Sequence, residues 1–99
     1  MRDYELTDRA VLDLAAARDW YDQHGTELGN RFLDAAYEAI RIARERPESC
    51  PEIHRGVRGI RCRRFPYRVY FESGPEKIIV LSVYHTARDP QRWNDDRRT

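Results

Sequence analysis

The chain has 99 residues, of which 40% are hydrophobic and 35% are charged, and its formal net charge at pH 7 is +1. A chain of this length buries one two-layer core, so we expect a single domain over residues 1–99 and exclude a multidomain enzyme. No apolar run approaches the roughly 18 residues that a membrane-spanning helix needs, and the N-terminus lacks a signal-peptide pattern, so we expect a cytoplasmic protein with no membrane contact.

The first half of the chain predicts a short strand followed by two helices. Residues 3–6 read as a strand, and Thr7 suits the N-cap of a helix whose apolar residues recur at helical spacing. Gly25 suits the end of that helix, and Thr26 suits the cap of a second helix, which carries an apolar stripe and ends at Pro47. Because so few residues separate the two helices, we expect an antiparallel helical hairpin.

Beyond the helices the apolar pattern changes to an alternation with period two. Residues 57–64 predict an arginine-rich strand, on which Ile60 and Cys62 face one way while Arg61 and Arg63 face the other. Several guanidinium groups should therefore leave one face of the sheet together.

Two further strands complete the predicted sheet. Residues 67–72 alternate between apolar and polar side chains, and a Gly-Pro step at residues 74–75 predicts the turn that follows. Residues 78–83 are apolar on both faces, which is typical of a covered strand inside a sheet. The order β-α-α-β-β-β predicts an α+β fold, with the helical hairpin packed on one face of a small, antiparallel-dominated sheet. The opposite sheet face should stay partly open and carry the arginines.

The cysteines and histidines show no spacing typical of a metal site. Cys50 and Cys62 form no CxxC motif, and His24, His54 and His85 are far apart along the chain. We therefore expect no metal ion, no other cofactor, and two reduced thiols in a reducing compartment.

Charge is segregated along the chain. Residues 1–54 carry seven arginines against twelve acidic residues, whereas residues 55–99 carry ten arginines and one lysine against five acidic residues. Six arginines and no acidic residue lie between residues 55 and 68, a strip whose local field attracts anionic ligands. The strip has three readings: a solvated sheet face, a docking surface for an acidic partner, or a nucleic-acid-binding module in which exposed Tyr70 or Tyr84 stacks on bases.

A histidine at the end of the last predicted strand gives the chain a candidate for proton transfer. His85, together with Arg61, Arg63 and Arg88, has the ingredients of metal-free RNA cleavage, in which a base, an acid and a cation act around the phosphate. Because Tyr84 alternates with His85, the two side chains should project to opposite faces and not act as a pair.

Several segments resemble a known family. Residues 64–71, R-F-P-Y-R-V-Y-F, and residues 83–93, V-Y-H-T-A-R-D-P-Q-R-W, resemble the RelE/ParE superfamily of toxins from type II toxin–antitoxin modules. Residues 10–14 and 29–33 are similar to parts of that family's first and second helices. The resemblance implies a hetero-oligomer with a cognate, ParD-like antitoxin, and either DNA gyrase or the ribosome as the target.

The two branches of that superfamily differ in mechanism. RelE-like members are ribosome-dependent mRNA endonucleases that use arginines, a basic or histidine group and often a late tyrosine, whereas ParE-like members poison DNA gyrase. Residues 94–99 contain no tyrosine and include the adjacent acids Asp95 and Asp96, and residues 88–93 look more like the ParE branch. The resemblance therefore favours a gyrase-inhibiting toxin that is not an enzyme, with a ribosome-dependent mRNA endoribonuclease as the alternative.

The same reading assigns two sets of candidate binding residues. The set expected to contact the target combines the basic strip with the C-terminal arm: Arg61, Arg63, Arg64, Tyr84, Arg88, Arg92 and Trp93. The set expected to contact the antitoxin consists of three aromatic residues of the helices: Trp20, Tyr21 and Tyr37. Tyr21 also lies on the apolar stripe of its helix.

Overall fold

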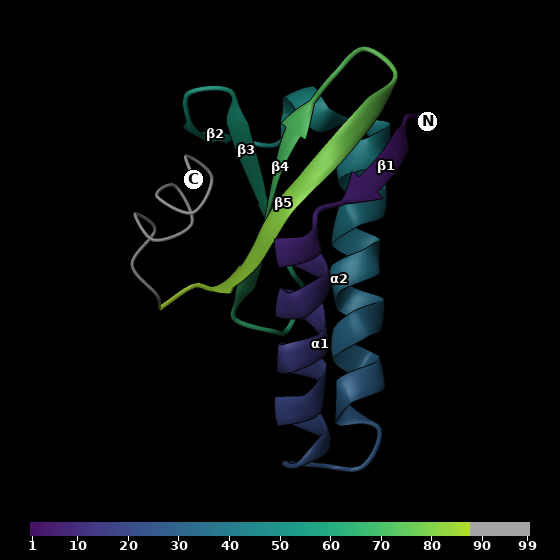
Figure 1. The fold of residues 1–99 in the computed structure, drawn as a ribbon, viewed down its shortest axis with the longest axis vertical. Coiled ribbons are helices and arrows are strands. Elements are labelled where there is room, and N and C mark those ends of the chain that lie inside the picture. Colours follow the sequence, from purple (N-terminus) through teal and green to yellow (C-terminus); the bar gives the residue numbers. More distant parts are fainter. Residues whose placement is uncertain (88–99) are drawn as a thin grey trace.

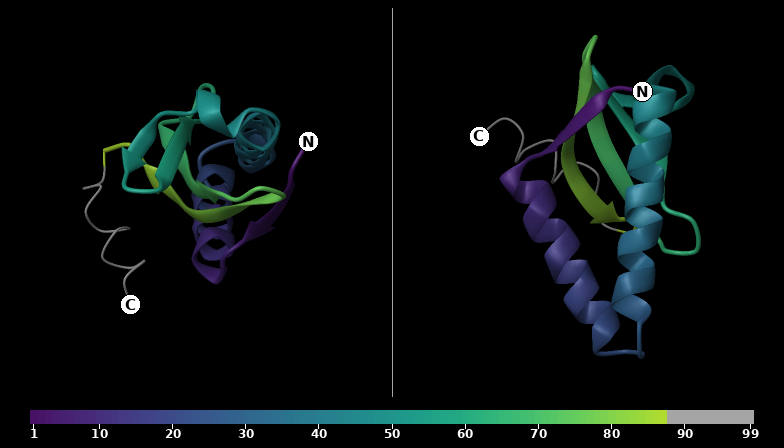
Figure 2. Two further views of the ribbon diagram at one scale, coloured as in Figure 1. Left: turned by 90° about the horizontal axis from the view of Figure 1, so that it is seen from above. Right: turned by 90° about the vertical axis from the view of Figure 1, so that its right-hand side faces the viewer.

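The computed structural model describes residues 1–87, in which a helical hairpin packs on one face of a five-stranded sheet (Figures 1 and 2). The α+β fold class predicted from the sequence is confirmed. The elements in chain order are β1 (Asp3–Leu6), α1 (Asp8–Asp22), α2 (Leu28–Glu45), a short 3-10 helix (Pro47–Ser49), β2 (Glu52–His54), β3 (Val57–Arg61), β4 (Tyr67–Ser73) and β5 (Lys77–His85).

The strands lie in the order β1-β5-β4-β3-β2. β1 runs parallel to β5, and the other neighbouring pairs are antiparallel, as the sequence predicts for the sheet as a whole. β5 has a neighbour on each side, and its side chains enter a buried cluster on each face of the sheet, which accounts for its apolar residues on both faces. The sequence does not predict the edge strand β2, because its three exposed residues are too few to show an alternation.

The arginine-rich strand is shorter than the sequence predicts. β3 ends at Arg61, so the prediction of a strand over residues 57–64 is wrong at its C-terminal end. Cys62 N still donates to Tyr67 O at 2.9 Å, which closes the intervening loop. Within that loop Arg64 has a φ of 69°, a left-handed conformation that a strand does not allow. The strand alternation therefore stops at Arg61 and does not set the direction of the later arginines.

A bulge in β5 changes which of its residues face the helices. One step along β4, from Tyr70 to Phe71, corresponds to two steps along β5, from Ser82 back to Val80, so Leu81 is an extra residue in the ladder. Because side chains alternate between faces along a strand, the extra residue exchanges the faces of every side chain beyond it.

The bulge decides where the last two residues of β5 point. His85 lies on the helix side, where its ring meets the edge of Tyr67, a member of the main core, at 5.2 Å between centroids. Tyr84 lies on the other side and packs with Val57 and Tyr70 in a second buried cluster. The prediction that Tyr84 and His85 project to opposite faces is confirmed.

The start of α1 holds the bulge in place. Thr7 is the N-cap expected from the sequence: its Oγ1 accepts a hydrogen bond from Ala10 N at 3.1 Å and donates one to Leu81 O at 2.8 Å. One turn further, Asp13 Oδ2 accepts a hydrogen bond from Val83 N at 2.9 Å. The carbonyl oxygen of Leu81 and the amide of Val83 are thereby paired with the side chains of Thr7 and Asp13, which ties α1 to β5 beside the bulge.

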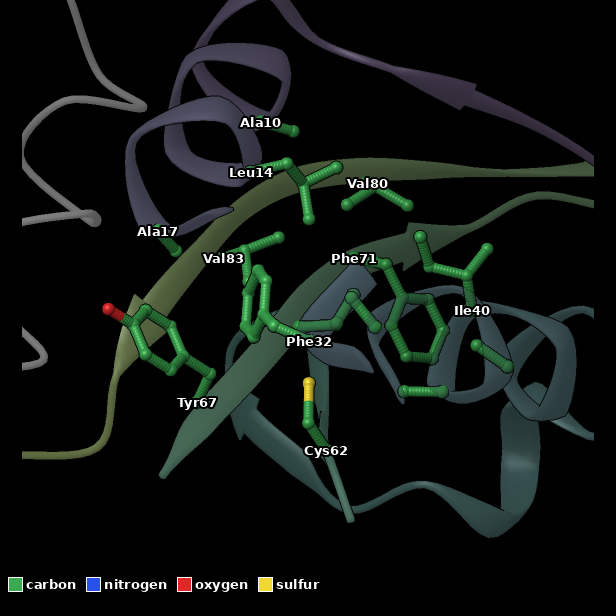
Figure 3. Close-up of a cluster of buried hydrophobic side chains, with 14 of the residues drawn as sticks. Ala10, Leu14, Ala17, Phe32, Ile40, Cys62, Tyr67, Phe71, Val80 and Val83 are labelled. Atoms are coloured by element: carbon green, nitrogen blue, oxygen red, sulfur yellow. The ribbon is translucent and has the colours of Figure 1, made fainter. Parts of the chain in front are cut away.

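The main core lies between the hairpin and the sheet (Figure 3). Phe32 and Ile40 from α2 meet Phe71 from β4 and Val80 from β5, and all four side chains are fully buried. Burial of apolar side chains of this size stabilises a small domain by roughly 1.5–3 kcal/mol each.

The two helices are closely packed at Gly29. Its N–H donates to Asp22 Oδ1 at 3.0 Å, and a Cβ at this position would lie 2.8 Å from the carbonyl oxygen of Arg18. A side chain at this position therefore forces the helices apart, so the glycine sets the spacing of the hairpin.

We expect Thr7→Val to lower the free energy of unfolding by roughly 1–3 kcal/mol, because it removes both the N-cap and the bond to the bulge while keeping the side-chain shape. Thr7→Ser keeps the hydroxyl group and should cost much less. Urea denaturation of the two variants checks this; equal destabilisation by both substitutions contradicts the assigned role of the hydroxyl.

Candidate functional site

An apolar groove runs between α1 and the end of β5. Its volume is about 590 Å³, large enough for one or two bulky side chains of a partner. It is lined by Asp13, Ala16, Ala17, Trp20 and Tyr21 from α1, and by Pro66, Tyr67, Val83 and His85 from the sheet side.

The exposed edge of the groove is an apolar ridge on α1. Trp20 is 52% exposed, and its ring stacks on that of His24 at 3.8 Å between centroids, while His24 Nδ1 lies 2.7 Å from Trp20 O. Leu12 and Ala16 precede Trp20 at intervals of four residues and continue the ridge, with Leu12 66% exposed. Sequence reasoning missed Leu12, although its spacing from Trp20 was visible. Tyr37 is also exposed, but it lies on α2 and does not line the groove.

Tyr21 forms the inner wall of the groove and belongs to the core. Its ring stacks on Phe32 at 5.4 Å and meets the edges of Phe65 and Tyr67. Burial raises the pKa of Tyr21, and the neighbouring Tyr67 and Cys62 raise it further. Tyr21 therefore forms a buried wall of the groove, whereas Trp20 is the more accessible of the two aromatic residues.

A row of polar residues crosses the other face of the sheet. The strand registers place Arg61 of β3 opposite Arg68 of β4, and Arg68 opposite Tyr84 of β5. Arg68 belongs to the basic strip but is absent from the predicted target-binding set, because strand registers are not visible in one sequence. Tyr70 and Tyr84 are only 4% and 6% exposed, so the prediction that they are open to stacking with bases is wrong. Their rings pack edge to face at 6.3 Å instead.

Three of the five predicted target-binding arginines lie within residues 1–87, and the structure does not bring these three onto one sheet face. Arg61 ends β3, whereas Arg63 and Arg64 lie in the following loop and are exposed. The pKa of Glu38 on α2 is lowered first by its hydrogen bond with Arg41 and also by the charge of Arg63, which places Arg63 near the hairpin.

His85 is separated from Arg61 by the sheet itself. His85 lies at the groove, and its Nδ1 accepts a hydrogen bond from Ala87 N at 3.0 Å, which leaves Nε2 to carry the proton in the neutral ring. Arg61 belongs to the row on the opposite face. The remaining predicted residues lie outside the described part of the chain: Arg88, Arg92 and Trp93.

Within residues 1–87, no three side chains of histidine, cysteine, aspartate or glutamate are grouped so that they could hold a metal ion. Over the same residues, no helix combines the length and apolar character needed to cross a membrane.

Comparisons with known proteins agree with this architecture. The family described as "ParE toxin of type II toxin-antitoxin system, parDE" matches residues 4–90. A solved structure described as "Chromosomal ParDE TA system from P. aeruginosa" has the same fold, with a TM-score of 0.73 and 22% sequence identity over 86% of this chain and 96% of that chain. No curated protein matches the sequence.

The fold is that of a RelE/ParE-type toxin, a helical hairpin laid on a sheet whose first strand is parallel to its last. The family match covers most of the chain, and the chain therefore belongs to the ParE toxins of type II toxin–antitoxin systems.

The core beneath the groove contains the thiol of Cys62, whose pKa is raised by burial. Burial raises the pKa of Cys62 from an ordinary value of 9.0 to about 11. Between these values the unfolded chain loses the thiol proton while the folded chain keeps it, so the free energy of unfolding should fall by roughly 2–3 kcal/mol as the pH rises. Cys62→Ala should flatten this slope in denaturation series across that pH range; an unchanged slope contradicts the assignment to Cys62.

Proposed function

We propose that this ParE toxin is held inactive in a complex with a cognate antitoxin of ParD type, and that a segment of the antitoxin docks in the groove beside α1. The observation that carries this proposal is Trp20, a large aromatic side chain that is half exposed at the edge of an apolar groove. Contiguous exposed apolar surface on a small domain marks an interaction site, and tryptophan is enriched among residues that dominate binding energy.

The charge of the hairpin side defines the chemistry of the docking segment. The first 54 residues carry twelve acidic residues against seven arginines, so this half of the chain is acidic. A complementary antitoxin segment places one or two large apolar side chains in the groove and basic side chains on either side. Leu12 and Trp20 lie eight residues apart on α1 and provide two anchor points, about 12 Å apart along the helix axis.

We expect Trp20→Arg to weaken binding of the antitoxin by about 100-fold, because it removes an aromatic anchor and places a cation opposite the basic flanks of the partner. Ile53→Arg is the matched control, since Ile53 is an exposed apolar residue on the edge strand β2, away from the groove. Isothermal titration of each variant with the cognate antitoxin measures the effect. Equal affinities for the two variants contradict docking in the groove.

For the target, we propose DNA gyrase rather than the ribosome. Ribonuclease chemistry requires an acid, a base and a cation around one phosphate. His85 and Arg61 lie on opposite sides of the sheet, so the pair cannot surround one phosphate in this conformation. A gyrase poison transfers no proton and does not need this pairing. We propose that this toxin contacts gyrase through Arg61, through Arg63 and Arg64 of the following loop, and through residues 88–93.

We expect truncation after Asp89 to abolish toxicity and His85→Gln to preserve most of it, because the arm contacts the target whereas the imidazole transfers no proton. Growth arrest after induction, read together with DNA breaks and mRNA cleavage, measures both effects. If the toxin instead cuts mRNA at defined codons, and His85→Gln lowers the cleavage rate by about 10²–10⁴, the ribosome is the target.

A nucleic-acid-binding module is less well supported. Its stacking residues, Tyr70 and Tyr84, are buried, so base stacking cannot contribute to binding through them.

A further inference from the structure

Two arginines face each other across neighbouring strands on the sheet face that points away from the helices. The register pairs Arg61 of β3 directly with Arg68 of β4. In such pairs the Cβ atoms lie about 5 Å apart, and like charges placed directly opposite destabilise the sheet. Among residues 1–87 neither guanidinium group forms an ion pair. By contrast, other cations of this part of the chain do form ion pairs, among them Arg18, Arg41 and Lys77.

The side chain of Arg68 is held by close packing over Gly59. A Cβ at Gly59 would lie 3.0 Å from Cδ of Arg68 and 2.9 Å from Cγ1 of Ile53. The aliphatic stem of Arg68 therefore crosses β3 where a side chain is missing. Because this packing restricts the stem, a ligand that binds the guanidinium group has less side-chain freedom to remove.

The surroundings of this pair strengthen its electrostatic interactions. Tyr84 is the cross-strand partner of Arg68 on its other side, and Tyr70 follows Arg68 on the same face of β4; both tyrosines are buried. Arg68 is half-buried beside these rings, which lower the local dielectric constant and strengthen its attraction to an anion, whereas Arg61 is exposed and stays accessible to a ligand. The acidic residue on this face of β4, Glu72, lies four positions along the strand, beyond Tyr70.

We propose that Arg61 and Arg68 form a binding site for a dianionic phosphate group, either free phosphate or a phosphate monoester. A phosphate group offers several acceptor oxygens to two guanidinium forks, and its bidentate contacts with arginine are short and strong. A monoester carries a charge between −1.5 and −2 near neutral pH, which balances the two facing cations, whereas a phosphodiester carries only one. The site does not depend on which target or antitoxin the toxin has.

The test is thermal unfolding of the full chain in sodium phosphate and in sodium chloride at equal ionic strength. Phosphate should raise the Tm of the unmodified protein, and Arg61→Gln and Arg68→Gln should each remove this gain. Arg31→Gln is the control, because it removes the same charge from an exposed position on α2 and should keep the gain. In chloride, Arg61→Gln should not lower the Tm, since it relieves the repulsion between facing cations. Equal Tm values of the unmodified protein in the two salts overturn the proposal, as does a full gain in Arg61→Gln.

The two sources of the phosphate group are separated with a short oligonucleotide that is made with and without a 5′-phosphate. NMR titration should shift the amide signals of Gly59, Arg61 and Arg68 with the phosphorylated form, at an affinity at least about tenfold tighter than with the unphosphorylated form. Binding of inorganic phosphate but not of this oligonucleotide identifies a site for free phosphate. Equal binding of both oligonucleotides shows that phosphodiesters suffice and overturns the choice of a dianion.

Discussion

The hydrogen bonds between the start of α1 and the bulge of β5 are the constraint on which both surfaces of this toxin depend. Thr7 caps the helix and binds the carbonyl oxygen of Leu81, and Asp13 binds the amide of Val83, so one extra residue in β5 is stabilised from the helix side. A bulge leaves backbone groups outside the ladder, and a buried backbone group without a partner is costly. The first half of α1 therefore also stabilises the bulge that sets the alternation of the neighbouring strand.

The bulge directs the last residues of β5 to two chemically different surfaces, one on each side of the sheet. Beyond it, Val83 and His85 face α1 and complete the groove at Trp20. The intervening residue Tyr84 faces the other way and lies in the row that contains Arg68. An apolar groove suits a protein segment, whereas facing arginines suit an oxyanion. A neutralising partner and an anionic ligand can thus act on opposite sides of one small sheet.

The close packing of the helical hairpin places the groove where a partner can reach it. Gly29 lets α2 approach α1, and the connection between the helices lies well beyond the end of the sheet (Figure 1). Trp20 lies two residues before the end of α1, where it lines the groove with Tyr67 and His85 and is half exposed. The same fold at 22% identity in a ParDE system indicates that this arrangement tolerates extensive change of sequence. A core of this kind depends on the volume and apolar character of the residue at each position more than on its exact identity.

Periodicity and capping in the sequence determined the helical hairpin, the N-cap at Thr7 and every strand except β2, because these depend on residues close together in the chain. The expected cap of the second helix at Thr26 was wrong, since the N-cap of α2 is Glu27, which makes no side-chain hydrogen bond there. Periodicity also determined that Tyr84 and His85 lie on opposite faces, since neighbours in a strand alternate. Tertiary structure alone decided which face each one takes, because the bulge that sets their direction is held by hydrogen bonds from a helix some 70 residues earlier. Tertiary structure also decided that Arg61 and Arg68 are cross-strand partners and that Tyr70 is buried. Strand register and burial arise from contacts between segments that are distant in sequence, and no local pattern records them.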